Sequence, residues 1–171
     1  QRDFYTKDNK MKTITYKARI TSMPASQFMS GAPKTDEKAG NETHEQFEER
    51  SWKQKIRTND DGHVVLNQFA LKNALESAAG RLRMKVPGQK GSEFKKLFLQ
   101  GIMINTTPIL LNANGKPCKV DDFYANRLFV PSGGKKGEGT RVFRIFPTIN
   151  AWQCEFEIIV LDPKITMDVL K

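Results

Sequence analysis

The chain has 171 residues, 38% of them hydrophobic, which is the size of one domain with a substantial core, so we expect a single domain over residues 1–171. It lacks a run of 18 apolar residues, and its first residues lack the apolar core of a signal peptide, which argues against membrane insertion and secretion and favours a cytoplasmic protein. Its two cysteines, Cys118 and Cys154, have no CxxC or Cys/His spacing, so we expect no disulfide framework, metal or cofactor.

The positive charge is concentrated in the middle of the chain. The net charge is +9 and the pI is about 9.6, which favours an anionic partner. Residues 36–50 hold six acidic residues against two basic ones, whereas residues 80–144 hold thirteen Lys or Arg against four acidic residues, a net of +9. This uneven distribution indicates a binding surface, although a run of like charges is also typical of a merely solvated face.

The first third of the chain predicts a strand, a long insertion, a short helix and a hairpin. Residues 13–20 alternate apolar and polar side chains, as a half-buried strand does. Residues 22–42 are rich in Gly, Pro, Ser and charge, and we expect a flexible insertion there. Thr43 and Gln46 match a capping box that begins a helix ending near Trp52. Residues 53–58 and 63–66 read as the two strands of a hairpin.

A long amphipathic helix follows, and its end carries the first basic loop. Asn67 is placed to cap it, and the helix is expected to end near Lys85, before Pro87 and Gly88. The segment after it, VPGQKGSEFKK, is predicted to be a loop. The apolar face of the helix is predicted from the i, i+3, i+4, i+7 spacing of Leu71, Ala74, Leu75, Ala78 and Leu82.

The second half of the chain is predicted to consist mainly of strands. Residues 97–105 read as a strand in which Gly101 marks a bulge or a close backbone approach. Further strands are expected at 127–130, 141–147 and 152–161, with a turn at Asn114 and Gly115. Residues 131–140, with four glycines, are expected to form a second flexible, basic insertion.

A helix is expected to begin at Ile165, after Asp162 and Pro163 break the preceding strand. We expect this helix to continue past Lys171, so that the sequence is a fragment truncated at its C-terminus. The order of elements indicates an α+β fold, with a mainly antiparallel sheet and helices on one face. This is the class of the RRM and ferredoxin-like folds, here with basic loop insertions.

Two stretches resemble the RAMP superfamily. VVLNQFALKNALESAAGRLRMKV is similar to its strand-turn-helix pattern LKxALRxxxE, with Leu71, Lys72, Ala74 and Leu75 on matching positions. FEIIVLDPKITMDVLK is similar to the later strand and helix, which in CRISPR backbone subunits precede a glycine-rich loop. The resemblance implies an RRM-like domain that grips single-stranded RNA by its backbone, with neighbouring subunits stacked in a filament, in an antiviral-defence or phage-encoded nucleoprotein assembly.

The leading hypothesis is therefore a subunit that binds single-stranded RNA or DNA, RNA preferred, and forms a homo-oligomer or filament. Two basic loops are expected to close on the phosphate backbone, with further basic residues lining the groove between them. The predicted contacts are Lys72, Arg81, Arg83, Lys85, Lys90, Lys95, Lys96, Lys135, Lys136, Arg141 and Arg144. Phe94, Phe129 and Phe143 are candidates for base stacking, with burial in the core as the alternative for each.

No catalytic residue is assigned. Neither His44 nor His63 has a neighbourhood that indicates a nucleophile or a metal set. The carboxylate pairs 60–61 and 121–122 suit turns, and their alternative role is to hold Mg²⁺ or assist RNA cleavage. Two other functions stay open: an endoribonuclease of the same fold, and a protein assembly module whose acidic segment 36–50 docks on the basic surface of another copy.

Overall fold

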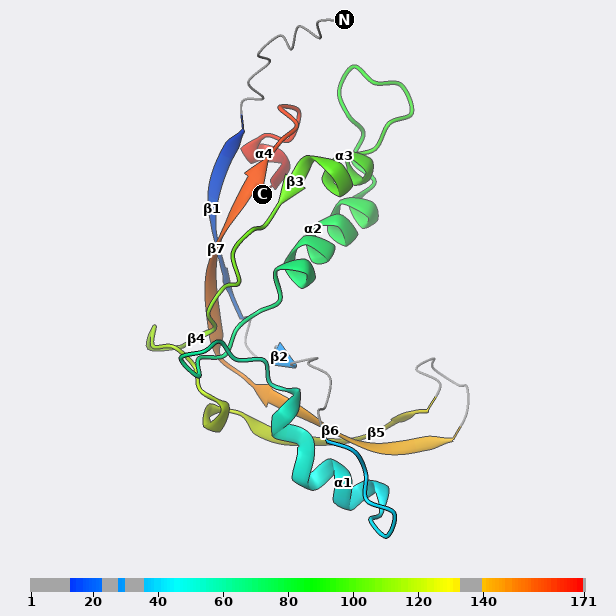
Figure 1. Cartoon of the computed structure of the whole chain (residues 1–171). Coiled ribbons are helices and arrows are strands. Elements are labelled where there is room, and N and C mark those ends of the chain that lie inside the picture. The colour runs from blue at the N-terminus through cyan, green and yellow to red at the C-terminus, as the bar shows by residue number, and fades with distance from the viewer. Residues whose placement is uncertain (1–12, 23–27, 30–35, 133–139, 171) are drawn as a thin grey trace, which may run out of the picture. The chain divides into compact units, whose positions relative to one another are not determined.

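The computed structural model describes residues 13–22, 28–29, 36–132 and 140–170 (Figure 1). It contains helices and antiparallel strands, which confirms the predicted α+β class. The elements in chain order are β1 (Ile14–Thr21), β2 (Phe28–Met29), α1 (His44–Ser51), the 3₁₀ helix η1 (Trp52–Lys55), α2 (Gln68–Leu82), α3 (Phe94–Gly101), β3 (Ile102–Met103), β4 (Leu111–Asn112), the 3₁₀ helix η2 (Val120–Asp122), β5 (Tyr124–Pro131), β6 (Arg141–Ile149), β7 (Trp152–Val160) and α4 (Met167–Leu170).

The chain, for which length and composition predict one domain, forms two compact units. Unit 1 comprises the chain up to Ala18, Asn67–Thr106 and the residues from Phe156 onward. Unit 2 comprises Arg19–Leu66 and Thr107–Glu155. Strands β1 and β7 each contribute residues to both units, so neither unit is built from one continuous stretch of sequence.

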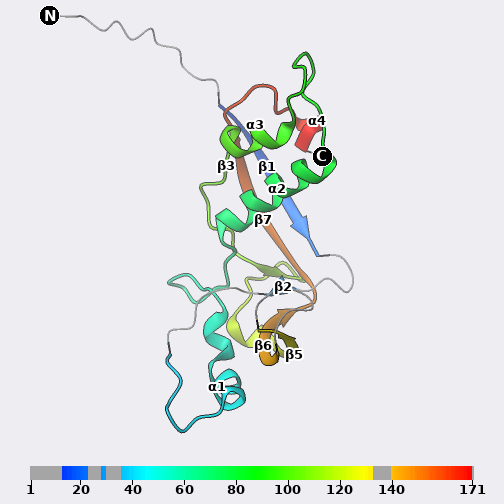
Figure 2. The ribbon, with the colours of Figure 1, turned by 90° about the vertical axis from the view of Figure 1, so that its right-hand side faces the viewer.

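Unit 1 is a small antiparallel sheet with helices on one face. Its strands have the order β1-β7-β3, and Ile102 of β3 lies opposite Val160 of β7. Helices α2 and α3 lie on the same side of these strands in both views (Figures 1 and 2). Along the chain the unit therefore runs strand, helices, strand, strand, helix, which is the order in which a ferredoxin-like β-α-β-β-α-β arrangement begins.

The core of unit 1 depends on a close approach at Gly101. A Cβ atom at this position would lie 3.0 Å from both Asp162 Cβ and Ile165 Cδ1, so only glycine leaves room for the chain that follows β7. The Leu161 backbone N–H donates to the Gly101 carbonyl at 2.8 Å. The close backbone approach predicted at Gly101 is thereby confirmed, and Ile165 is fully buried against it.

Helix α2 begins as predicted, but it ends at Leu82, three residues before the predicted end near Lys85, and it buries a narrower face than expected. The Asn67 side chain accepts from the Phe69 backbone N–H at 2.9 Å, which confirms the predicted N-cap. Leu71 and Ala79 are buried, whereas Ala74, Ala78 and Leu82, which were predicted to share the buried face, are exposed. Leu71 and Ala79 lie eight residues apart, with half-buried Leu75 between them, so the buried positions follow one edge of the predicted stripe.

The strand predicted at residues 97–105 is wrong over most of its length. Residues up to Gly101 belong to helix α3, and only Ile102 and Met103 form a strand. Phe94, Leu97, Phe98 and Gly101 follow the i, i+3, i+4, i+7 spacing of one helix face, and three of these four positions are buried. Without Phe94, the apolar residues from Leu97 onward also fit a strand. With Phe94 included, they fit the period of a helix, so the predicted strand came from too short a window of sequence.

Unit 2 is built around the β5–β6 hairpin. Its sheet has the order β2-β6-β5 with antiparallel pairing, and β5 and β6 are paired from Tyr124 opposite Thr148 to Pro131 opposite Arg141. In the same unit the turn predicted at Asn114 and Gly115 is confirmed, with Gly115 at φ +75°. The predicted strand 53–58 is instead mostly the 3₁₀ helix η1, and the expected hairpin is reduced to one bridge between Thr58 and Val64.

Two of the predicted features fall wholly or partly outside the described residues. Most of the glycine-rich insertion 131–140, including Lys135 and Lys136, lies outside them, as does most of 22–42. The described part of the latter, from residue 36 onward, is held by Arg50. Within the ranges that the structure describes, no helix is both long and apolar enough to cross a bilayer.

Candidate nucleic-acid interface

An ordered turn structure, residues 84–94, connects α2 to α3, and we call it the basic hairpin. The Phe94 N–H donates to the Met84 carbonyl and the Val86 N–H to the Ser92 carbonyl, both at 3.0 Å. Gly88 at φ +73° and Gly91 at φ +81° make the two turns at its tip, where a side chain with a Cβ would be strained. Buried Val86 anchors the hairpin, which extends as the green loop beyond α2 and α3 in Figure 1.

One carboxylate lies among the cations at the base of this hairpin. Lys85 and Glu93 face each other across a backbone bridge, and Lys85 Nζ donates to Glu93 Oε1 at 2.9 Å. The hydrogen bond from Lys85 and its charge lower the pKa of Glu93, and the charges of Arg83 and Lys95 lower it further. Arg83, Lys85 and Lys95 therefore gather around a single acidic group.

Helix packing fixes the position of Lys95. This residue was predicted to lie in a loop, but it belongs to α3, and its aliphatic stem lies against Gly80 of α2. A Cβ atom at position 80 would meet Lys95 Cδ at 3.1 Å, so the glycine leaves the space that the stem occupies. The packing of α3 against α2 thus fixes the stem of Lys95, and the charge of Lys95 acts on Glu93 of the basic hairpin.

The remaining cations of this region are exposed. Arg83 is the C-cap of α2 and adopts the left-handed conformation, with φ 50° and ψ 31°. In the part of the chain that the structure describes, no carboxylate lies within ion-pair distance of Arg81, Arg83, Lys90, Lys95 or Lys96. Together with Lys85 these form the basic cluster, six cations and the single acidic residue Glu93 between Gly80 and Lys96. Lys72 is different, because it is half-buried and lies 3.7 Å from Glu76.

Unit 2 carries an aromatic pair, of which Phe129 is exposed and Phe143 is half-buried. Phe129 of β5 lies opposite Phe143 of β6, and their rings meet edge to face with centroids 5.7 Å apart. Phe129 is 67% exposed, and Arg141 lies two residues from Phe143 on the same face of the hairpin. The stacking role predicted for Phe94 is wrong, because this ring is only 3% exposed and belongs to the core of unit 1.

Arg144, predicted to contact nucleic acid, is bound to a buried carboxylate instead. Glu48 of α1 is fully buried, and its Oε1 accepts from Arg144 Nη1 at 2.9 Å. Its Oε2 accepts from Lys55 Nζ at 2.7 Å and from the Ile145 backbone N–H at 3.0 Å. Glu48 thereby fastens α1 and η1 to the edge of β6 opposite β5, where the His44 ring also contacts the Phe143 carbonyl. This role of Arg144 is structural.

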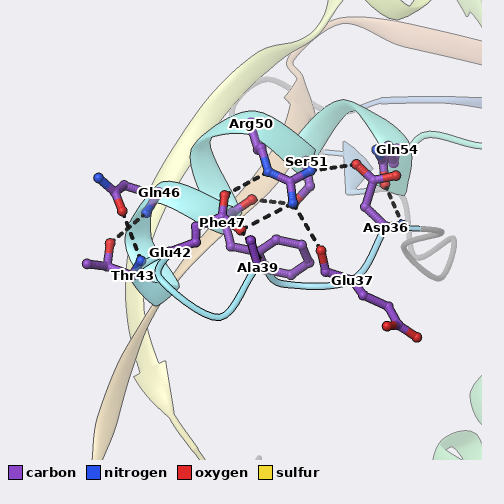
Figure 3. Close-up of polar contacts among 10 residues, drawn as sticks. All are labelled: Asp36, Glu37, Ala39, Glu42, Thr43, Gln46, Phe47, Arg50, Ser51 and Gln54. Carbon is purple, nitrogen blue, oxygen red and sulfur yellow. Dashed lines mark hydrogen bonds and ion pairs between the residues drawn. The ribbon is translucent and has the colours of Figure 1, made fainter.

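Most acidic residues of segment 36–50 are neutralised within unit 2. Arg50 donates to Asp36 Oδ2 at 2.6 Å, to Glu42 Oε1 at 2.7 Å and to the Glu37 carbonyl at 3.0 Å (Figure 3). The hydrogen bond from Arg50 lowers the pKa of Glu42. On the other side of α1, Glu49 accepts from Arg127 at 2.8 Å. These internal pairs leave little of the acidic charge that was expected to attract another copy.

The predicted groove between two basic loops stays a prediction, because the described residues include only the first of these loops. The cluster on α2, the hairpin and α3 belongs to unit 1, whereas Arg141 and the aromatic pair belong to unit 2. Lys135 and Lys136 lie outside the described residues. Sequence reasoning found the cations of the cluster but missed Glu93 as their shared partner, although its position eight residues after Lys85 in a glycine-containing turn was a usable signal.

Of the two acidic pairs considered for metal binding, the pair 121–122 has structural contacts. Asp121 accepts from Lys53 at 2.8 Å, and Asp122 accepts from the Lys119 backbone N–H at 2.7 Å, as residues of η2. Among the residues in the described ranges, no group of three or more His, Cys, Asp or Glu side chains is arranged to hold a metal ion.

Comparisons with protein-family models, with curated proteins and with solved structures gave no match to this chain. The functional interpretation therefore depends on the residues and contacts of the chain itself.

Proposed function

We propose that the chain binds single-stranded nucleic acid, RNA preferred, through backbone phosphates held by the basic cluster. The observation that carries this proposal is the concentration of cations on one ordered element. Six Lys or Arg side chains share a single carboxylate, and five of them have no ion-pair partner among the described residues. In unit 2, by contrast, Arg50, Arg127 and Arg144 are paired internally.

Uncompensated cations of this kind favour a polyanion. Each phosphate that they neutralise releases condensed counterions, so the free energy of binding depends on the number of contacts and on the salt concentration. Lys side chains supply point charges and Arg83 supplies a planar fork of donors, a combination that recognises phosphate without reading bases. Binding is then largely independent of sequence.

The preference for a single strand is supported by the aromatic pair. Exposed Phe129 offers a flat apolar face beside Arg141, and unpaired bases stack on such rings whatever their identity. A duplex keeps its bases stacked on each other and gains nothing from this ring. Side-by-side assembly of copies on one strand, which the RAMP resemblance implies, belongs to the same proposal and is checked by the mass of the complex.

The test is binding to labelled single-stranded RNA, single-stranded DNA and duplex over a salt series. Changing Arg83, Lys90 and Lys96 together to Gln should lower affinity on every sequence and reduce the slope of log K against log salt by about 2, since each lost phosphate contact on a single strand removes about 0.7. The matched control changes Lys38, Lys116 and Lys164 to Gln, three exposed cations outside the cluster, and should keep the wild-type slope.

Equal losses in the two triple variants would mean that net charge alone attracts the nucleic acid. No binding by the wild type at low salt would refute the proposal and leave the protein assembly module as the function to test. Cleavage of the RNA that is lost on changing one acidic or histidine side chain would instead identify the endoribonuclease.

A further inference from the structure

We propose that Glu93 is a built-in competitor for the nucleic acid, because its carboxylate holds Lys85 in the free protein, and Lys85 would otherwise bind a backbone phosphate. This inference rests on the proposed function and deepens it, since it names the residue that sets the affinity of the basic cluster.

The contacts place Glu93 at the centre of the cluster. Its side chain is 33% exposed and that of Lys85 is 63% exposed, so solvent and ligand reach both ends of their 2.9 Å ion pair. The backbone bridge between the two residues holds them opposite each other on the two strands of the hairpin. The positive charges of Arg83 and Lys95 also lower the pKa of the Glu93 carboxyl.

The position of Glu93 distinguishes it from a capping residue. It is the N-cap of α3, yet its side chain makes no capping hydrogen bond to the helix. Asn67, at the same position of α2, does cap its helix through its side chain. The Glu93 carboxylate is instead directed to Lys85, so its contribution is electrostatic and lies with the cations rather than with the helix end.

A carboxylate and a phosphate compete for the same donors. Both present two or more negatively charged oxygens to Lys and Arg side chains, so a phosphate that approaches Lys85 must displace Glu93 or accept its repulsion. In the free protein, Glu93 thereby neutralises the charge of Lys85. Removing the charge of Glu93 while keeping its shape frees Lys85 and adds one contact for the nucleic acid.

The experiment compares Glu93→Gln with the wild type and with Asp168→Asn, a matched loss of one exposed negative charge in the same unit. Single-stranded RNA of 20 nucleotides is the probe, at 50 to 300 mM salt. Glu93→Gln should bind about 3- to 10-fold more tightly at the lowest salt, with a slope steeper by about 0.7, and the difference should shrink as salt rises. Asp168→Asn should change the affinity by less than about 1.5-fold.

A double-mutant cycle distinguishes the specific pairing of Lys85 with Glu93 from a general effect of net charge on binding. Lys85→Gln should weaken binding little in the wild type, where Glu93 already neutralises Lys85, and several-fold more in the Glu93→Gln background. Circular dichroism and thermal melting of each variant establish that the hairpin still folds.

Two outcomes overturn the inference while leaving the proposed function standing. One is binding by Glu93→Gln that equals or falls below that of the wild type, when the wild type itself binds with a steep salt dependence. The other is an equal effect of Lys85→Gln in both backgrounds. If neither the wild type nor Glu93→Gln binds at 50 mM salt, the proposed function itself fails, and the inference with it.

Discussion

Replacing Glu48 with Ala should destabilise unit 2 strongly. The substitution removes the acceptor of three donors: Arg144, Lys55 and the Ile145 N–H. The Arg144 side chain is 40% exposed and can turn to water, so its loss costs little. Lys55 is only 14% exposed and loses its carboxylate partner, although it still donates to the Ile145 carbonyl. Breaking a buried pair on one side costs about 3 to 5 kcal/mol, and we expect about 3 kcal/mol once the exposure of Arg144 is taken into account.

Tryptophan fluorescence in urea measures this loss in the correct unit, because Trp52 and Trp152, the two tryptophans of the chain, both belong to unit 2. With a slope of about 2 kcal/mol per molar urea, a loss of about 3 kcal/mol lowers the midpoint by about 1.5 M. Glu45→Ala, on the exposed face of α1, is the control and should change the free energy of unfolding by less than about 0.5 kcal/mol. Equal midpoints for the two variants would refute the assignment of Glu48 as the group that fastens α1 to β6.

Three further outcomes are expected elsewhere. The pKa of Glu42 is lowered in the folded chain by Arg50, so the contribution of this pair to stability is fully present above the ordinary pKa of 4.5 and is lost as the pH falls through the lowered value. Carboxyl NMR titration should show the pKa returning toward its ordinary value in Arg50→Gln. Gly101→Ala should destabilise unit 1 by about 1 to 3 kcal/mol, measured by hydrogen exchange, since the added methyl has no space. Burial raises the pKa of Cys118 and of Cys154 to about 11, so both thiols should resist alkylation at pH 8 until unit 2 unfolds.

Each of these outcomes has an internal control. Arg50→Gln should leave the titration of Glu93 unchanged, because Lys85 lowers that pKa in unit 1. Gly40→Ala should be nearly neutral, because nothing lies within 4 Å of its added Cβ. Rapid alkylation of either cysteine in the native chain would contradict its burial. Hydrogen exchange in unit 1 that is unaffected by Gly101→Ala would contradict the close approach at that residue.

Local sequence patterns were sufficient where a structure depends on neighbours along the chain. The alternation of Cys154, Phe156, Ile158 and Val160 predicted β7, and these four residues are buried as expected. The capping box at Thr43 formed with both of its hydrogen bonds for the same reason. Such features are decided within a few residues. The face of α2 that is buried depends on where the rest of unit 1 contacts the helix. The spacing of apolar residues within the helix does not predict these contacts.

The candidate site shows the same division. The cations of the basic cluster were predictable because they crowd within seventeen residues of sequence, and their exposure follows from their charge. The pairing of Arg144 with Glu48 was not predicted because the two residues lie 96 positions apart, and a buried carboxylate with long-range donors has no signature in sequence. For Phe94, stacking and burial both stayed open in the sequence, because an aromatic residue beside lysines looks the same whether its ring is packed or free, and the structure shows burial.

The way in which the two units share the chain has a consequence for synthesis on the ribosome. The last residues that unit 2 needs, up to Glu155, emerge before the segment from Phe156 onward that completes unit 1. Helices α2 and α3 cannot pack against the end of β7 until the 49 residues from Thr107 to Glu155 have been made, and their apolar faces are exposed until then. Unit 2 should fold first and fix both ends of segment 67–106, since the residues on either side of it belong to unit 2. The loop that must be closed when unit 1 folds is then shorter.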